Sequence, residues 1–403
     1  MKGTRSATVV WISFIAVFMC LTMLCVPPSM AADEITVGFS MSLTGVYAAA
    51  ALGQMQAYQL WEDRVNKAGG IKVGDKQRPI KLVYYDDKSQ AATAVKVYEK
   101  LITQDKVDVL LSPNSTSIHF AVAPLAEKYK VPLVGSAAAS VKLRDIKTNY
   151  FWFITACLPD RQMKALVDLL QSLKVKDVAI IYVQDLFPRE NLEFLKPYLE
   201  KAGINIVLLK DYPLGAKDLT TLLSEAKSKK PQALIALCYA ADSFTITTQV
   251  QEVGFNPDFF FGLVGPATVV YGPKFKEATE GIATMGHWSE KAKWPGAKEF
   301  FDAYVAKWGK KPDPLNSVLA YTACQIVQQA VEKTGGTDPK KLRDCIAGNT
   351  FETINGPIKF SGLENLETPS MILQWQKGSL EIVWPESAAT AKPLFPKPKW
   401  PTK

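Results

Sequence analysis

Ile35-Thr36-Val37-Gly38-Phe39-Ser40 is a short run in which large apolar residues alternate with small ones, and the spacing of apolar residues changes directly after it. The run predicts a buried β-strand, because it is brief and rich in β-branched residues. Tyr58, Trp61 and Val65 then recur at intervals of three and four, which predicts one apolar helix face. Gly69-Gly70 predicts the end of that helix. A strand followed by a helix is the repeating unit of α/β proteins.

The alternation of strand and helix continues beyond this first unit. A strand is predicted at 80–85, a helix at 90–103, and further strands at 107–111 and 131–134. This order predicts a parallel sheet with helices on both faces.

The pattern starts again near residue 178, without a repeat of the sequence itself. The elements predicted there are strands at 178–183, 204–209, 233–237 and 259–264 and helices ending at Ala202 and covering 217–229. Long helices at 297–308 and 315–334 follow, then short strands at 356–360, 371–375 and 380–383. The chain therefore predicts two α/β units of similar plan.

The N-terminus has the parts of a secretory signal peptide. Lys2 and Arg5 precede an apolar run at 9–26, and Ser29-Met30-Ala31-Ala32 places small residues around a cut after residue 31. We expect residues 1–31 to be removed on export. The alternative is a retained membrane anchor, because the apolar run is nearly long enough to span a bilayer.

Length and charge narrow the class of molecule. The chain has 403 residues and a formal charge of +8, and loss of the two cations in the signal peptide lowers the charge to +6. A chain of this length suits two domains. Its charges are scattered, and no dense basic run interleaved with aromatic residues predicts a nucleic acid partner.

Metal sites and the common catalytic motifs are not predicted. After cleavage the soft metal ligands would be four cysteines and two histidines, namely Cys157, Cys238, Cys324, Cys345, His119 and His287. No two cysteines have the C-x-x-C spacing, so we expect no metal site. The sequence has no Walker loop and no G-x-G-x-x-G, G-x-S-x-G or H-E-x-x-H motif, so we expect neither a cofactor nor an enzyme.

Cys324 and Cys345 are predicted to form a disulfide. They lie on predicted helices on either side of the turn Gly335-Gly336, and Pro339 suits the start of the second helix. At about 1.5 Å per residue, they would reach similar heights on an antiparallel helix pair.

Three polar residues need an interpretation of their own. Asp86 and Asp87 point to opposite faces of a strand, so they cannot easily share one substrate, and a turn or cap role is favoured. His119 follows the polar stretch 114–117 and is open to a structural role or a role in a site.

Two loops are placed where a ligand would bind. In doubly wound sheets, ligands bind beyond the carboxyl ends of the strands, beside helix N-termini with unpaired N–H groups. The segments 111–117 and 135–140 lie there and consist mostly of serine, threonine and alanine. Hydroxyl and N–H donors suit a carboxylate, which only accepts hydrogen bonds. The alternative is that both loops are ordinary helix caps and turns.

These segments, taken in order, resemble the leucine/isoleucine/valine-binding family. The matching motifs are Ile35-Thr36-Val37-Gly38, Ser42-Leu43-Thr44-Gly45, Asn66-Lys67-Ala68-Gly69-Gly70-Ile71, Tyr85-Asp86-Asp87, Ala121-Val122-Ala123-Pro124-Leu125-Ala126-Glu127 and Val131-Pro132. The resemblance covers almost the whole chain after the signal peptide. It implies a type I periplasmic binding protein, with two doubly wound parallel-sheet lobes joined by three crossover strands. The implied limits are 33–157 with 287–366 for lobe one, and 158–286 with 367–403 for lobe two.

The resemblance also implies ligand contacts at particular positions. The serine that holds the ligand's carboxylate corresponds to Ser115, or to Thr116 if the alignment slips by one. The other corresponding positions are Ala137, Ala139, Phe187, Tyr239 and Val264.

Three of these positions depart from the family. Ala139 replaces a threonine, Phe187 replaces a tyrosine, and Val264 stands where amino-acid binders have the acid that pairs with the ligand's α-ammonium. Burying an unpaired ammonium costs several kcal/mol, so we expect a carboxylate ligand with an apolar or aromatic body and no α-amine. The alternative is an amino-acid receptor in which Asp185 or Asp242 replaces the missing acid.

The resemblance implies a periplasmic receptor that delivers a small carboxylate to the permease subunits of an ABC importer. We expect a monomer that binds its ligand between the two lobes. A module that senses a ligand for a separate signalling partner is a second candidate.

Overall fold

The computed structural model describes residues 34–155, 158–291, 293–368 and 370–401. The predicted signal peptide and Cys157 lie outside these ranges. The described residues from Ile35 onward form one compact unit. Within them, no helix is both long and apolar enough to cross a membrane.

The first sheet has eight strands with a parallel centre. They are β1 (Ile35–Met41), β4 (Ile80–Asp86), β5 (Val109–Leu111), β6 (Leu133–Gly135), β7 (Phe151–Phe153), β13 (Thr350–Thr353), β14 (Gly356–Ser361) and β15 (Glu364–Asn365). Their order is β13-β14-β15-β7-β6-β5-β1-β4. β1 pairs in parallel with β4 on one side and β5 on the other. The segment that opens the pattern is thus an interior strand of the sheet, with Ile35, Val37 and Phe39 fully buried.

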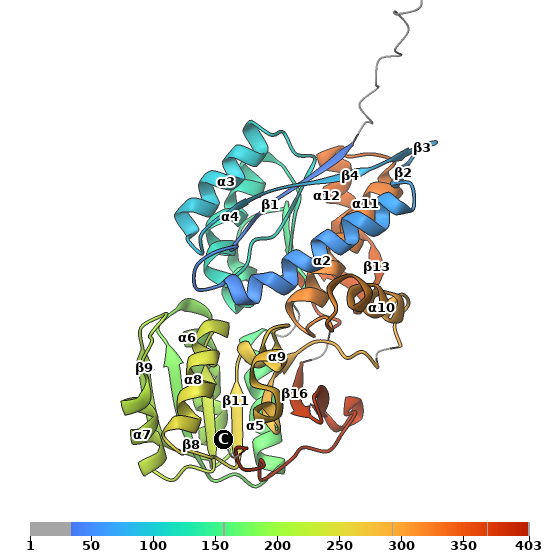
Figure 1. The fold of residues 1–403 in the computed structure, drawn as a ribbon. Helices are drawn as coiled ribbons and strands as arrows, with labels where there is room; N and C mark the ends of the chain where they lie inside the picture. The colour runs from blue at the N-terminus through green and yellow to red at the C-terminus, as the bar shows by residue number, and fades with distance from the viewer. Residues whose placement is uncertain (1–33, 156–157, 292, 369, 402–403) are drawn as a thin grey trace, which may run out of the picture. The chain divides into compact units, whose positions relative to one another are not determined.

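Helices cover both faces of the first sheet. They are α2 (Ala48–Lys67), α3 (Ala91–Thr103), α4 (Thr116–Tyr129), α11 (Asn316–Thr334) and α12 (Pro339–Gly348). Helix α2 connects β1 to β4, toward one edge of the sheet, whereas α3 and α4 connect β4 to β5 and β5 to β6, toward the other edge. Because such crossovers are right-handed, α2 lies on one face of the sheet and α3 and α4 lie on the other. Accordingly α3 packs with α4 and α2 packs with α11. Figure 1 shows these two pairs on opposite sides of the sheet.

The second sheet has seven strands and the same plan. Its helices are α5 (Pro159–Ser172), α6 (Leu186–Lys201), α7 (Thr220–Ser228), α8 (Ala240–Glu252) and α9 (Tyr271–Phe275). The strands are β8 (Asp177–Val183), β9 (Asn205–Tyr212), β10 (Ala233–Leu237), β11 (Phe259–Gly262), β12 (Ile282–Gly286), β16 (Met371–Gln376) and β17 (Ser379–Trp384). Their order is β17-β16-β12-β11-β10-β8-β9, and only β16 and β17 run antiparallel to their neighbours. Apart from short 3-10 helices, the remaining described elements are α10 (Ala297–Trp308) and a hairpin of β2 (Ile71–Val73) and β3 (Lys76–Arg78).

The chain passes between the two sheets three times. It leaves the first sheet after β7, returns after β12, and leaves again after β15. The predicted fold class, two doubly wound lobes with three connections, is therefore confirmed. We call each sheet with its helices the first and the second lobe, and the residue limits given above stay a prediction.

The predicted elements are present with small differences at their ends. Strand β11 ends at Gly262 rather than 264, because Val264 has turned to helical dihedral angles (φ −117°, ψ −46°) before Pro266. The turn role of the two aspartates is confirmed. Asp86 accepts from the backbone N–H of Leu43 at 3.0 Å, and Asp87 accepts from the hydroxyl of Ser40 at 2.7 Å.

The predicted disulfide between Cys324 and Cys345 is wrong, because both are free thiols. Cys324 is fully buried on α11 close to Tyr58 of α2, and burial followed by the charge of Cys324 raises the pKa of Tyr58 to about 12. Cys345 on α12 instead has its Sγ 3.6 Å from Nδ2 of Asn349. Sequence spacing estimates height along a helix, but it does not fix the face from which a side chain projects.

Candidate functional site

One cavity lies at the carboxyl ends of the parallel strands of both sheets. Residues that follow β5, β6 and β7 line it from the first lobe, and residues that follow β8, β10 and β11 line it from the second. Its volume, counted as space for the centre of a water molecule, is about 50 Å³. All seven residues predicted from the sequence line this cavity, namely Ser115, Thr116, Ala137, Ala139, Phe187, Tyr239 and Val264. Their role as ligand contacts stays a prediction.

Ser115 is the N-cap of α4 and faces the cavity. Its φ of 73° is a conformation that a residue other than glycine adopts only where its surroundings hold it. Its Oγ accepts from the N–H of Ile118 at 3.4 Å. The N–H groups of Thr116 and Ser117, the first residues of α4, have no acceptor within the helix. A hydroxyl and a helix N-terminus at one place favour an anion such as a carboxylate.

Thr116 has a different task from Ser115. Its Oγ1 accepts from the N–H of Ala139 at 3.1 Å and donates to the carbonyl of Ala139 at 3.4 Å. The hydroxyl therefore ties the loop after β6 to the start of α4. Ser115 and Thr116 are the two candidates for the carboxylate contact. The hydroxyl of Ser115 makes one hydrogen bond with the backbone and that of Thr116 makes two, so Ser115 is the better placed to bind a ligand.

His119 lies beneath Ser115 and supports it. Its Nδ1 is 2.7 Å from the carbonyl oxygen of Ser115, and the side chain is fully buried. Burial lowers the pKa of His119 to about 4, so the ring is neutral near pH 7 and Nδ1 donates its hydrogen to that carbonyl. Of the two roles left open for His119, the geometry supports the structural one, in direct contact with a cavity residue.

A buried polar network holds the loop before Ser115. Gln54 on α2 donates from Nε2 to the carbonyls of Ser112 and Pro113, each at 3.0 Å, and its Oε1 accepts from Asn114 at 2.9 Å. The hydroxyls of Ser112 and Ser136 lie 2.9 Å apart. The network joins α2 to both cavity loops, so the loops are positioned by a rigid helix.

An aromatic pair and a valine form the wall from the second lobe. The rings of Phe187 and Tyr239 have their centres 6.3 Å apart, and Tyr47 of the first lobe meets Tyr239 edge to face at 5.0 Å. The hydroxyl of Tyr239 is buried and has no hydrogen-bond partner among the described residues. Burial, and then the nearby Asp185 carboxylate, raise the pKa of Tyr239 well above 10. Val264 adds only an apolar side chain to this wall.

Neither acid considered as a replacement lines the cavity. The carboxylate of Asp185 accepts from the hydroxyl of Tyr47 at 2.8 Å and from that of Ser117 at 3.0 Å. Asp242 accepts from the N–H of Gly215 at 3.2 Å, and burial raises the pKa of Asp242 to about 6.

The lining as a whole is uncharged. Sixteen described residues line the cavity, and none of them is an aspartate, glutamate, histidine, lysine or arginine. In the described ranges, no group of histidine, cysteine, aspartate and glutamate side chains could hold a metal ion. The arrangement can hold a small anion with neutral donors and can enclose an apolar body.

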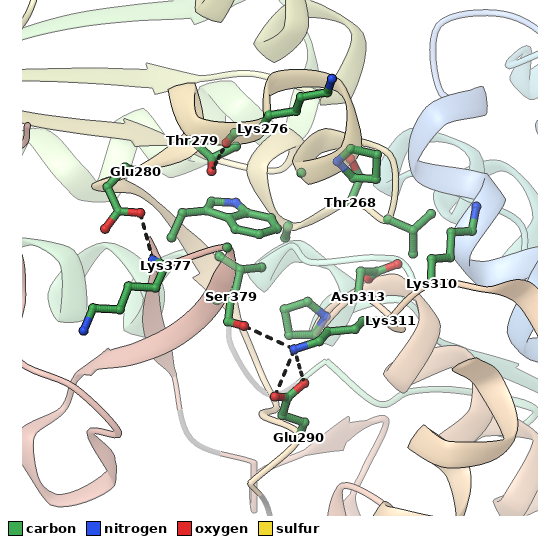
Figure 2. Close-up of a pocket in the computed structure, with 18 of the residues that line it drawn as sticks. Thr268, Lys276, Thr279, Glu280, Glu290, Lys310, Lys311, Asp313, Lys377 and Ser379 are labelled. Carbon is green, nitrogen blue, oxygen red and sulfur yellow. Dashed lines mark hydrogen bonds and ion pairs between the residues drawn. The ribbon is translucent and has the colours of Figure 1, made fainter. Parts of the chain in front are cut away.

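A larger groove of about 900 Å³ lies next to the cavity, and Figure 2 shows the residues that line it. Lys311 lies 2.9 Å from Glu290 and 3.2 Å from the hydroxyl of Ser379 in the second lobe. Unlike the cavity, the groove has lysines and acidic residues along its walls. Asp313 lines the groove, whereas Asn316, three residues later, lines the cavity, so this short segment separates the two spaces.

Sequence reasoning missed several residues that line the cavity. They include Ala50, Met285, Leu315, Asn316 and Leu319. Leu315 and Asn316 were interpreted only as the start of a helix. The available signal was a polar asparagine two residues after Pro312-Asp313-Pro314, at the start of a predicted helix, where the cavity residues Ser115, Phe187 and Tyr239 also stand.

Two doubly wound lobes with a cavity at the carboxyl ends of both sheets define a type I periplasmic binding protein. A family model described as periplasmic binding protein matches residues 34–379, and the chain belongs to that family. Leu/Ile/Val-binding protein homolog 7 of Brucella suis is 24% identical over 387 residues, which cover 91% of this chain and 95% of that protein. The resemblance found in the sequence is confirmed.

Solved structures share the fold. The branched-chain amino acid transporter substrate-binding protein LivJ of Streptococcus pneumoniae, solved with isoleucine, has a TM-score of 0.78 at 23% identity, covering 88% of this chain and all of that chain. An ABC transporter solute-binding protein of R. palustris, solved with benzoate, has a TM-score of 0.79 at 19% identity, covering 90% of this chain and 99% of that chain. At these identities the likeness concerns the fold alone.

Proposed function

We propose that this chain is the receptor of an ABC importer for a carboxylate with an aromatic or apolar body and no α-ammonium. One observation carries the proposal: the sixteen described residues that line the cavity include no aspartate or glutamate. The resemblance to amino-acid binders aligns one of these residues, Val264, with the acid that accepts the ligand's ammonium. An α-ammonium would lose its water and find no charged acceptor, which costs several kcal/mol. A carboxylate would meet Ser115 and the start of α4.

The second lobe supports an aromatic body. Phe187 and Tyr239 form a tilted pair beside Val264, and aromatic contacts add about 0.5–1.5 kcal/mol beyond the area that they bury. The similar structures include one with isoleucine and one with benzoate, so the shared fold is compatible with either class of ligand. The uncharged lining of the cavity favours the acid without an amine.

An amino-acid receptor is the second candidate, and it requires Asp185 or Asp242 to accept the ammonium. Both oxygens of Asp185 already accept hydrogen bonds from the first lobe, and Asp242 does not line the cavity. Either acid would have to change its partners before it could serve an amine. The proposal therefore favours an acid without an amine.

The proposal includes export by a cleaved segment at residues 1–31 and transfer of the ligand to permease subunits. These steps follow from membership of the family rather than from contacts in the structure. A module that senses a ligand for a signalling partner would use the same cavity. Genes for a permease beside the gene for this chain would favour transport.

Titration calorimetry with matched ligands tests the specificity. We expect 3-phenylpropionate to bind about 100-fold more tightly than phenylalanine, because the pair differs by the α-ammonium. Val264→Glu should reverse the preference, whereas Val264→Thr, of similar shape, should keep it. Tighter binding of phenylalanine, leucine or valine than of any amine-free acid would contradict the proposal.

A further inference from the structure

We infer that Asn316 forms a second polar end of the cavity, which selects a neutral oxygen substituent on the ligand's ring, opposite the carboxylate. The inference rests on the proposed function and narrows its ligand to a hydroxylated or alkoxylated aromatic acid.

The amide of Asn316 is buried without a partner. The residue is 6% exposed, lines the cavity, and has no hydrogen-bond partner for Nδ2 among the residues that the structure describes. Burying a donor without an acceptor is costly, and native proteins seldom tolerate it without a reason. A ligand atom that accepts this hydrogen bond would remove the cost, because Asn316 lines the space that the ligand would fill.

The position of Asn316 places it away from the carboxylate end. Ser115 begins α4, and Asn316 is the first residue of α11. Helix α4 packs with α3 and α11 packs with α2, on opposite faces of the first sheet (Figure 1). The cavity at the edge of the sheet thus has one helix start at each end. A single ring between them would point one substituent to each.

Asp313 decides which substituent suits the second end. Its Oδ1 accepts from the N–H groups of Leu315 at 3.0 Å and Ser317 at 3.2 Å, and also from that of Asn316. This carboxylate satisfies the start of α11 and would repel a second anion. The amide of Asn316 is left as a neutral donor, which matches a hydroxyl, ether or carbonyl oxygen.

The unpaired hydroxyl of Tyr239 belongs to the other end. It lies near Asp185, which bonds Ser117 at 3.0 Å, two residues from Ser115. It can add a donor to the carboxylate, but it does not serve a group beside α11.

Calorimetry with benzoate, 4-hydroxybenzoate and terephthalate tests the inference. We expect the full chain without its signal peptide to bind 4-hydroxybenzoate about 10-fold more tightly than benzoate, and terephthalate more weakly than either. Asn316→Leu should bind the first two acids equally, with benzoate bound no more weakly than before. The isosteric Asn316→Asp, which replaces the donor by an acceptor, should bind 4-methoxybenzoate no more tightly than benzoate, because an ether oxygen can only accept a hydrogen bond.

Asn355 provides a matched control. Its Nδ2 is also buried without a partner among the described residues, but Asn355 does not line the cavity, so Asn355→Leu should keep the preference. Melting temperatures without ligand show whether each variant is folded. Equal affinities for benzoate and 4-hydroxybenzoate in the unchanged protein, or a preference that survives Asn316→Leu, would overturn the inference, while benzoate binding would still uphold the proposed function. Binding of amino acids in place of all three acids would overturn the proposed function itself.

Discussion

His119 determines how Ser115 faces the cavity. Ser115 holds a positive φ, which costs about 1–3 kcal/mol unless its surroundings stabilise it. The ring of His119 donates to the carbonyl of Ser115 and also lies 6.4 Å from the ring of Phe151 below it. The histidine is therefore a positioning residue, which acts on the ligand through the backbone of Ser115.

We predict that His119→Phe weakens binding of the carboxylate ligand about tenfold, because it removes the donor while it fills the same space. Titration calorimetry measures the loss. His287→Phe is the control, since the ring of His287 is also buried, has no hydrogen-bond partner among the described residues and does not line the cavity. An equal loss of affinity in both variants would show that general destabilisation, and not the position of Ser115, is responsible.

At the scale of elements, the start of α11 depends on a close approach by α2. Gly53 of α2 lies so near that an added Cβ would be 2.1 Å from Oδ2 of Asp313 and 2.8 Å from the hydroxyl of Ser317. Burial raises the pKa of Asp313 to about 6. Tyr304 and Lys310 are ionisable residues close enough for the charge of Asp313 to affect their pKa values. Asp313 must fit this space while it holds the helix start that positions Asn316.

The titration of Asp313 should make stability depend on pH. The pKa of Asp313 in the folded protein, about 6, lies above the ordinary value of 3.8, so the protonated carboxyl favours the folded state. This contribution to the free energy of unfolding is complete below pH 3.8 and is lost as the pH rises through 6. We predict that Asp313→Asn, which keeps an acceptor oxygen, removes this loss and gains about 2 kcal/mol at pH 7 relative to its effect at pH 4. Denaturant unfolding at the two pH values measures it. A gain that is the same at both would refute the assignment.

The sequence predicted elements better than it predicted their contacts. Strand β1 and the loops after β5 and β6 were found because local periodicity and the carboxyl-end rule depend on neighbouring residues. The cavity role of Asn316 depends on the packing of α11 beside α2, which brings together residues more than 250 positions apart. The wrong pairing of Cys324 with Cys345 has the same origin, since the face of a helix that packs inward is decided by its distant neighbours.

At the scale of the whole molecule, a few hydrogen bonds join the two lobes beside the cavity. Asp185 of the second lobe accepts from Tyr47 and Ser117 of the first. Glu190 of α6 accepts from the N–H of Val141, in the segment after β6, at 2.8 Å. These contacts exist only when the lobes meet, so they favour the closed form and, with it, the bound ligand.

We predict that Asp185→Ser weakens ligand binding about tenfold and speeds dissociation. Serine can still cap α6, but it is too short to reach Tyr47 and Ser117 together. Calorimetry and small-angle scattering, with and without ligand, measure affinity and closure. Asp218→Ser is the control, because Asp218 accepts from Thr220 in an exposed turn of the same lobe. Unchanged affinity in Asp185→Ser would contradict a role in closure.

The uncharged lining has a consequence for what the permease would meet. Under the proposed function, the ligand would enter the cavity without a counterion, because N–H and O–H dipoles would hold its carboxylate. The loaded receptor would then carry one more negative charge than the empty one, and its isoelectric point would fall. Affinity would change little with ionic strength, since salt screens exposed charges far more than buried hydrogen bonds. Loaded and empty receptors would thus differ electrically as well as in the arrangement of their lobes.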